Sequence, residues 1–540
     1  MYERFFPFDS IRDEQHKAIE FTLDAFERGI KFVILEMGTG CGKSATGITI
    51  ARACHAASDM STGAYVLTTQ KLLQDQYARD FGQQSTSKCN LLRSLKSSSN
   101  YKCGSKAGQT CAETRRITGN VQLAPVAAKT AEFKHCKTSC PYTLDKQAFL
   151  GSSISVTNFA YFLAETMYAG QLTPRDLLVI DECHNIEQEL GRFIEIVFSE
   201  RFAKDVLGCA GPGRNPTQAE VHAWIAGRYK RALQQYIADI EASVTTKLKD
   251  VAVDLGDLSK KLETVDKHIC KVNRFLDEYD PRKWVINVST GPIGNFRKFE
   301  FKPVDVSGHS ADALFKYGNK VLMMSATIVD RDVFCRTIGV PVNQVAFLRI
   351  PSPFPAANRP VHFFPIGSMS RANIDSTLPK MADVLRTILD EHAKDKGIVH
   401  CVNYRIAKYL VDTLQDKRLL LHDASNRDET IALHAKSTAP TVLVSPSMME
   451  GVDLAGDLSR FQVITKVPFP FLGDEVVKRR MNADSRWYSY QTARSVMQAL
   501  GRSVRSETDH AVSYILDADW QRFYGMNSDM FPTEFKDAVN

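Results

Sequence analysis

The chain contains 540 residues, of which 44% are hydrophobic and 24% are charged, and its formal net charge is +6. This length and balance predict a globular protein of about three or four domains. The N-terminus, MYERFFPFDSIRDEQ, is charged and lacks an apolar signal region, and no apolar run reaches the roughly 18 residues of a membrane span. We therefore expect a cytoplasmic protein, or a nuclear one in a nucleated cell, with no membrane partner.

The first predicted elements are a strand, a glycine-rich loop and a helix. The apolar run KFVILE (31–36) leads into MGTGCGKS, in which Met37 replaces the first glycine of the strict phosphate-loop pattern, and ATGITIARAC follows with the pattern of a helix. In such a loop backbone N–H groups close around phosphates, Lys43 reaches the β- and γ-phosphates, and the Ser44 hydroxyl binds Mg²⁺. The predicted ATP-binding residues of this loop are Gly38, Thr39, Gly40, Cys41, Gly42, Lys43 and Ser44.

The next segment, 85–150, is rich in lysine and cysteine. Eleven Lys and Arg residues stand there against three acids, so the segment carries +8 and the remaining chain −2. A basic surface favours a polyanionic partner, although a solvated lysine-rich loop has the same composition. In a reducing compartment, clustered cysteines favour a metal site over disulfides. The five cysteines of this segment are Cys89, Cys103, Cys111, Cys136 and Cys140.

A second apolar strand, LLVIDECH (177–184), ends in two adjacent acids. α/β sheets place their ligands at the carboxyl ends of strands. We therefore expect Asp181 to hold Mg²⁺ and Glu182 to orient and deprotonate an attacking water. A strand that ends in a solvated acidic turn is the alternative, and the upstream phosphate loop favours the catalytic interpretation.

Aliphatic residues then recur at alternating steps of three and four. This seam over four heptads predicts helices that pack along one face, and Gly256 indicates a kink or a turn within it. A coiled-coil dimer and an ordinary packing face are alternatives, and the pattern alone favours the packing face. The seam residues are Leu248, Val251, Leu255, Leu258, Leu262, Val265, Ile269, Val272 and Leu276.

Five further apolar strands alternate with helix-length segments, which predicts parallel α/β sheets. They are 321–327, 397–402, 441–446, 462–467 and 511–516. Between the last two lies QALGRSVRS, which contains Gln498, Arg502 and Arg505. Two arginines three residues apart share a helical face and can both reach the charge that develops on a γ-phosphate. A solvated helix face would show the same RxxR pattern.

These motifs resemble those of superfamily 2 helicases of the XPD/DinG iron-sulfur group, in the family's order and over nearly the whole chain. The matching stretches are EMGTGCGKS, VLTTQKLLQDQ, ISVTNFAYFL, VIDECH, MMSATI, PSPF, VLVSPSMMEGVDLAGD, ITKVPFP and QALGRSVRS. The resemblance implies an α/β fold with two RecA-like parallel-sheet motor domains. It implies that Arg12 and Gln15 lie near the nucleotide base, and that Gly451 and Asp453 link the second domain to the nucleotide. It also makes Gln498 a catalytic residue and Arg502 and Arg505 arginine fingers.

The same resemblance divides the chain into domains. It assigns 1–84, 151–191 and 301–349 to the first motor domain, 85–150 to an iron-sulfur domain, 192–300 to a helical arch, and 350–540 to the second motor domain. Cys103, Cys111, Cys136 and Cys140 would then hold a [4Fe–4S] cluster, with Cys89 to spare. The cysteine spacings match no common zinc pattern, but zinc remains the alternative, with His135 as a further ligand candidate.

The function that the resemblance implies is an ATP- and Mg²⁺-dependent DNA helicase. It would be a monomer that moves 5′ to 3′ on single-stranded and forked DNA, with RNA–DNA hybrids as an alternative substrate. A translocase that displaces proteins without unwinding a duplex is a rival. A nucleic-acid-binding scaffold with an inactive ATP site is another, against which the intact lysine and acids of the predicted site argue.

Overall fold

The structure is a computed structural model, and its first domain is built on a seven-stranded parallel sheet with the order β10-β1-β9-β5-β2-β4-β3. The residues that it describes are 2–58, 63–69, 71–82, 92–105, 107–113, 131–170, 172–247, 256–291, 296–423, 425–446, 454–504, 506 and 508–539. The seven strands are β1 (Phe32–Met37), β2 (Ala64–Thr68), β3 (Leu92–Ser94), β4 (Ile154–Asn158), β5 (Arg175–Asp181), β9 (Gly318–Ser325) and β10 (Val345–Ile350). The predicted strands at 31–36, 177–184 and 321–327 are all present.

Helices cover both faces of this sheet, which explains why its central strands are buried along their length instead of alternating. All six residues of β1, for example, are buried. The helices that pack around it include α1 (Asp13–Glu27), α2 (Lys43–Ala57), α3 (Lys71–Phe81), α8 (Phe159–Ala164), α9 (Ile186–Ile194) and α15 (Arg331–Ile338). The phosphate loop lies between β1 and α2, at the carboxyl edge of the sheet, as the sequence predicts.

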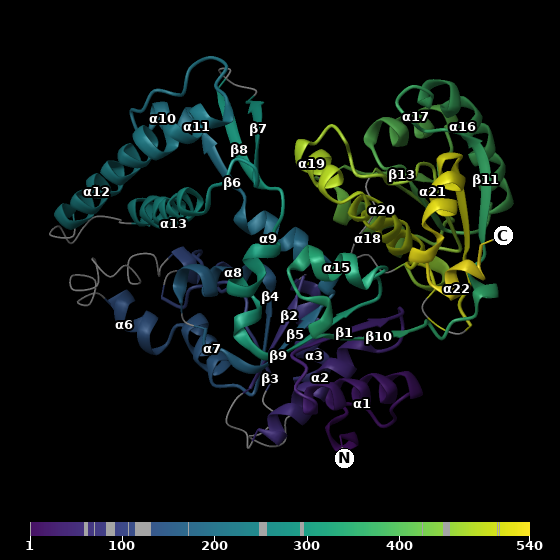
Figure 1. The fold of residues 1–540 in the computed structure, drawn as a ribbon, viewed down its shortest axis with the longest axis horizontal. Coiled ribbons are helices and arrows are strands. Elements are labelled where there is room, and N and C mark those ends of the chain that lie inside the picture. Colours follow the sequence, from purple (N-terminus) through teal and green to yellow (C-terminus); the bar gives the residue numbers. More distant parts are fainter. Residues whose placement is uncertain are drawn as a thin grey trace.

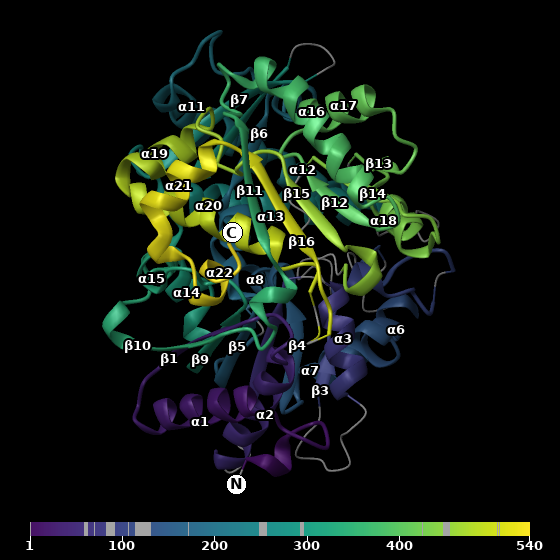
Figure 2. The ribbon, with the colours of Figure 1, turned by 90° about the vertical axis from the view of Figure 1, so that its right-hand side faces the viewer.

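The second domain repeats this architecture with a six-stranded parallel sheet of order β11-β16-β15-β12-β14-β13. Helices α16 to α18 lie on one side of the sheet and α19 to α21 on the other (Figure 2). The strands are β11 (Val361–Gly367), β12 (Gly397–His400), β13 (Leu419–Leu421), β14 (Val442–Ser445), β15 (Phe461–Ile464) and β16 (Val512–Asp517). The helices are α16 (Ile374–Glu391), α17 (Tyr404–Leu414), α18 (Arg427–Lys436), α19 (Glu475–Ala483), α20 (Ser485–Leu500), α21 (Asp519–Asn527) and α22 (Thr533–Lys536).

Two insertions extend from the first domain toward the left of the view in Figure 1. One, the cysteine-bearing insertion, carries α6 (Ala131–Thr138), which contains Cys136, and α7 (Pro141–Leu150), which begins directly after Cys140. The other has an antiparallel sheet of order β6-β8-β7. Its elements are α10 (Glu200–Asp205), α11 (Gln218–Trp224), α12 (Lys230–Lys247), α13 (Gly256–Glu278), β6 (Ile196–Ser199), β7 (Trp284–Thr290) and β8 (Arg297–Pro303).

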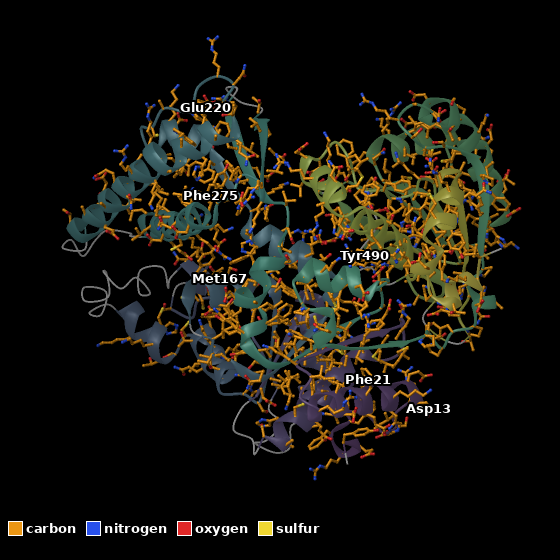
Figure 3. The ribbon with its side chains drawn as sticks, in the orientation of Figure 1. Asp13, Phe21, Met167, Glu220, Phe275 and Tyr490 are labelled. Carbon is orange, nitrogen blue, oxygen red and sulfur yellow. The ribbon has the colours of Figure 1, made fainter. Side chains whose placement is uncertain are left out.

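The described part of the predicted seam is a packing face of α13, which begins at Gly256. Leu262, Val265 and Val272 are buried there, in a core shared with the three-stranded sheet. Phe275, on the same helix, packs its ring 4.7 Å from that of Phe301 (Figure 3). The residues 248–255 of the seam lie outside the described part, as does the side chain of Leu258. In the described ranges, no helix is long and apolar enough to cross a membrane.

Candidate nucleotide site

The phosphate loop is contacted by two side chains at the N-terminal end of α1. Gly40 and Gly42 adopt φ values of 84° and 74°, a left-handed backbone that glycine adopts without strain. The guanidinium of Arg12 donates to the Gly40 carbonyl at 2.8 Å, and the amide of Gln15 donates to the Gly42 carbonyl at 3.4 Å. These two residues, which the family resemblance places near the nucleotide base, therefore contact the loop itself and hold two of its carbonyls.

The two acids after β5 lie directly opposite the loop. Asp181 is 2% exposed, and its Oδ2 accepts hydrogen bonds from Ser44 Oγ at 3.4 Å and from the Tyr77 hydroxyl at 2.8 Å. Burial and, next, the charge of Glu182 raise the pKa of Asp181 to about 6. A divalent cation would offset both causes. The hydroxyl of Ser44 and the carboxylate of Asp181 are hard oxygen donors of the kind that Mg²⁺ prefers.

A chain of polar contacts leads from Glu182 across the sheet. His184 Nδ1 lies 3.3 Å from the Glu182 carboxylate and 2.7 Å from Ser325 Oγ, and Ser325 Oγ accepts the backbone N–H of Thr327 at 3.1 Å. Burial lowers the pKa of His184 well below its ordinary value, so the imidazole stays neutral near pH 7. The MMSATI stretch, which contains Ser325 and Thr327, thus has a direct link to the acidic pair.

The second domain completes the cavity. A cavity of about 640 Å³ is lined by the phosphate loop, Asp181 and Glu182 from the first domain and by Gln498 and Arg502 from the second. The amide of Gln498 reaches Thr327 Oγ1 at 3.5 Å. Gln498 and Arg502 therefore line the same cavity as the phosphate loop. Arg505, Gly451 and Asp453 are outside the described ranges.

Helix α20 lies along the first domain through a series of polar contacts. Glu187, at the start of α9, accepts hydrogen bonds from Trp487 Nε1 at 3.1 Å and Gln491 Nε2 at 2.7 Å, and pairs with Arg480 at 2.9 Å. Further along the helix, Arg494 donates to the backbone carbonyl of His184 at 2.9 Å. One carboxylate of the first domain thus receives three side chains of the second.

The four predicted cluster ligands lie in the described ranges, but the structure brings only part of the set together. Cys111 and Cys140 are both 1% exposed, with their sulfur atoms 3.6 Å apart, and Cys136 is also buried. Within the described ranges, no three His, Cys, Asp or Glu side chains form a group that could hold a metal ion. Cys89 lies outside those ranges.

Three contributors to the site went unnoticed in the sequence. Tyr77 and Glu187 make the contacts given above, and Phe354 packs so closely on the phosphate loop that a Cβ on Gly40 would lie 2.2 Å from its ring. In the sequence, Tyr77 is an ordinary apolar position of a helix, and Glu187 has the composition of a solvated first turn. Only Phe354 had a signal, since it lies in the PSPF stretch that carries the family resemblance.

Comparison with known proteins gives matches at both ends of the chain. The family model described as helicase C-terminal domain matches residues 388–536, and that described as type III restriction enzyme, res subunit, matches residues 9–207. The ATP-dependent DNA helicase YoaA of Haemophilus influenzae is 24% identical over 34% of this chain, and the match spans 30% of that protein's length. YoaA of Escherichia coli is 21% identical over 94% of this chain and 91% of its own.

Solved structures give the same fold. The structure titled XPD_Helicase superposes with a TM-score of 0.64 at 14% identity, over 97% of this chain and 98% of its own. Xpd4 of S. tokodaii superposes with a TM-score of 0.56 at 13% identity, over 98% and 99% of the two chains.

Two RecA-like parallel-sheet domains that share one phosphate-loop cavity define the class of two-domain nucleotide-dependent motor proteins. The two family models and the relatives then point to a group within that class. The chain is similar to the XPD/DinG-like helicases of superfamily 2.

Proposed function

We propose that this protein hydrolyses ATP and uses the energy to move along one strand of DNA. This movement separates that strand from its complement where the two form a duplex. The observation that carries the proposal is the shared cavity, in which the phosphate loop of one domain faces Gln498 and Arg502 of the other. A site whose halves belong to different domains closes when nucleotide binds and opens when it leaves. This opening and closing is the motion that translocation requires.

The roles of the residues follow from their positions. Loop amides and Lys43 hold the phosphates, while Ser44 and Asp181 would hold Mg²⁺, which neutralises phosphate charge. Glu182 orients the attacking water and accepts its proton, with the neutral imidazole of His184 beside its carboxylate. Arg502 supplies positive charge to the γ-phosphate, and we expect Arg505 to do the same.

We propose single-stranded and forked DNA as the substrate, and a monomer that moves 5′ to 3′. Support comes from the relatives YoaA and DinG, which are ATP-dependent DNA helicases. The excess charge of segment 85–150 is also the kind that holds a phosphate backbone without reading sequence. RNA–DNA hybrids remain an alternative substrate that a competition assay would detect.

We further propose that Cys103, Cys111, Cys136 and Cys140 hold a [4Fe–4S] cluster. The donor set fits, because thiolates are the ligands that iron-sulfur clusters prefer. The 3.6 Å contact between two of the sulfurs leaves no room for iron atoms between them, so these side chains must separate on loading. A tetrahedral zinc site, with sulfurs about 3.8 Å apart by simple geometry from a Zn–S length of about 2.3 Å, is the alternative. A bound cluster would crosslink the insertion into a rigid body.

The test measures ATP turnover with and without single-stranded DNA, and unwinding of duplexes with either a 5′ or a 3′ tail, in protein purified without oxygen. We expect DNA-stimulated turnover and unwinding from the 5′ tail. ATP turnover and protein displacement without unwinding would support the translocase instead. Iron, acid-labile sulfide and zinc content decide the identity of the metal site.

A further inference from the structure

We propose that Tyr77 is a positioning residue that fixes the Asp181 carboxylate in the orientation needed to bind Mg²⁺. The proposal rests on the function proposed above. Its basis is the hydrogen bond of 2.8 Å from the Tyr77 hydroxyl to Asp181 Oδ2, between two side chains that are 1% and 2% exposed. No role in the nucleotide site follows for Tyr77 from the sequence motifs.

The contacts of the Asp181 carboxylate leave it one orientation. Its Oδ1 accepts the backbone N–H of Glu182 at 3.0 Å, while Oδ2 accepts the Tyr77 hydroxyl and, more weakly, that of Ser44 at 3.4 Å. Ser44 is itself a predicted Mg²⁺ ligand, so its hydroxyl turns toward the ion when one binds. The Tyr77 hydroxyl then remains as the side-chain donor that holds Oδ2.

The hydroxyl is held in place by the anchoring of α3. Gln74, one turn before Tyr77, donates to Ser94 Oγ at 2.9 Å and to the Leu95 carbonyl at 2.7 Å, and Asn158 donates to the Gln74 side-chain oxygen at 3.3 Å. On the next turn, the Tyr77 ring packs edge-on against Phe81, with 5.5 Å between ring centroids. The donor therefore sits on a helix tied to the chain after β3 and to the end of β4, and not on a mobile loop.

The first two turns of α3 also contact the flank of the cysteine-bearing insertion. Lys71 donates to the Asn100 side chain at 3.0 Å, and Asp75 pairs with Lys96 at 2.6 Å. Any displacement of α3 by that insertion would move the Tyr77 hydroxyl with it. Helix α3 thus contacts the Mg²⁺-binding carboxylate through Tyr77 and the insertion through Lys71 and Asp75.

The chemical consequence concerns metal affinity more than the hydrolytic step. Removal of a side chain that hydrogen-bonds to a metal-binding carboxylate typically lowers metal affinity or activity 10- to 100-fold. Tyr77→Phe keeps the ring and its contact with Phe81 but removes the donor. We expect the Mg²⁺ concentration for half-maximal effect to rise about 10-fold, and turnover at saturating Mg²⁺ to stay within about twofold of wild type.

The experiment titrates Mg²⁺ against binding of a fluorescent, non-hydrolysable ATP analogue, and separately against ATP turnover. Tyr65→Phe is the matched control, because Tyr65 is equally buried in the same domain and donates to the Thr173 carbonyl at 3.0 Å, away from the acids. Analogue binding without Mg²⁺ should be the same in all three proteins. Melting temperatures confirm that the variants are folded.

An equal Mg²⁺ requirement in Tyr77→Phe and wild type overturns the proposal, as does an equal shift in Tyr65→Phe. Failure of the wild type to bind the analogue at any Mg²⁺ concentration would overturn the proposed function instead. The two failures are therefore distinguishable.

Discussion

Glu182 adopts a left-handed backbone conformation, with φ of 53°, directly after the last residue of β5. Such conformations cost energy in residues other than glycine and cluster at functional sites. Here the conformation accompanies a side chain that is partly exposed beside the cavity, while Asp181 before it is buried. The two adjacent acids therefore have different surroundings. The buried Asp181 is suited to bind Mg²⁺, and the partly exposed Glu182 is suited to orient the attacking water.

We predict that Glu182→Gln lowers ATP turnover by at least about 100-fold, because the amide cannot accept the proton of the attacking water. Binding of the ATP analogue should persist, since the phosphate loop is unchanged. A steady-state ATPase assay beside an equilibrium binding assay measures both. Turnover equal to wild type would contradict the assignment of Glu182.

His400, at the end of β12, is a buried histidine whose two ring nitrogens meet no hydrogen-bond partner among the described residues. Burial and, next, the charge of Arg502 lower its pKa to about 3. The folded state thus favours neutral imidazole, while the unfolded state takes up a proton below about pH 6.5. The contribution of neutral His400 to the free energy of unfolding is therefore fully present above pH 6.5, and it is lost as the pH falls from 6.5 toward 3.

We predict that His400→Phe reduces the loss of stability between pH 7 and pH 5 and raises stability at pH 7 by about 1 kcal/mol. An aromatic ring is kept, while two unsatisfied polar atoms leave the core. Denaturant unfolding at several pH values measures this. A variant as sensitive to acid as wild type would show that other groups control the acid response.

At the scale of elements, α20 of the second domain packs against the first domain and makes polar contacts with it. Glu187 receives Trp487 and Gln491 of α20 and Arg480 of the preceding helix α19, and the far end of α20 presents Gln498 to the cavity. Loss of these contacts should loosen the closed arrangement of the domains before it affects either domain alone.

We predict that Glu187→Ala raises the ATP concentration for half-maximal turnover roughly 10-fold, since hydrogen bonds to charged groups contribute about 1.5–3 kcal/mol. Glu189→Ala on the same helix is the control, because Glu189 pairs with Arg192 of its own helix at 3.3 Å. ATPase kinetics of the two variants provide the comparison. Equal behaviour of the two would mean that α20 is positioned by other contacts.

The sequence predicted elements better than it predicted their contacts. The strands at 397–402 and 462–467 form as β12 and β15 because apolar runs between helix-length segments can be buried only in a covered parallel sheet. The edge strand β10 was missed, because VAFLRI follows a short helix and carries no motif. The partners of Glu187 could not be predicted, since contacts some 300 residues apart depend on how the two domains pack.

At the scale of the whole molecule, no described residue of segment 92–150 lines the nucleotide cavity, and Lys96 and Asn100 of that segment contact α3. We predict that Cys103→Ser abolishes duplex unwinding but leaves part of the ATPase activity, because the phosphate site does not include the insertion. Parallel assays of unwinding and ATP turnover test this. Equal loss of both would show that the insertion supports the entire first domain.

The most direct test of the central claim is strand separation of a forked DNA by the wild type and by Lys43→Ala, with ATP and Mg²⁺. Our interpretation predicts unwinding by the wild type and none by the variant, which loses the lysine that reaches the β- and γ-phosphates. Unwinding by Lys43→Ala equal to that of the wild type would contradict an ATP-driven motor.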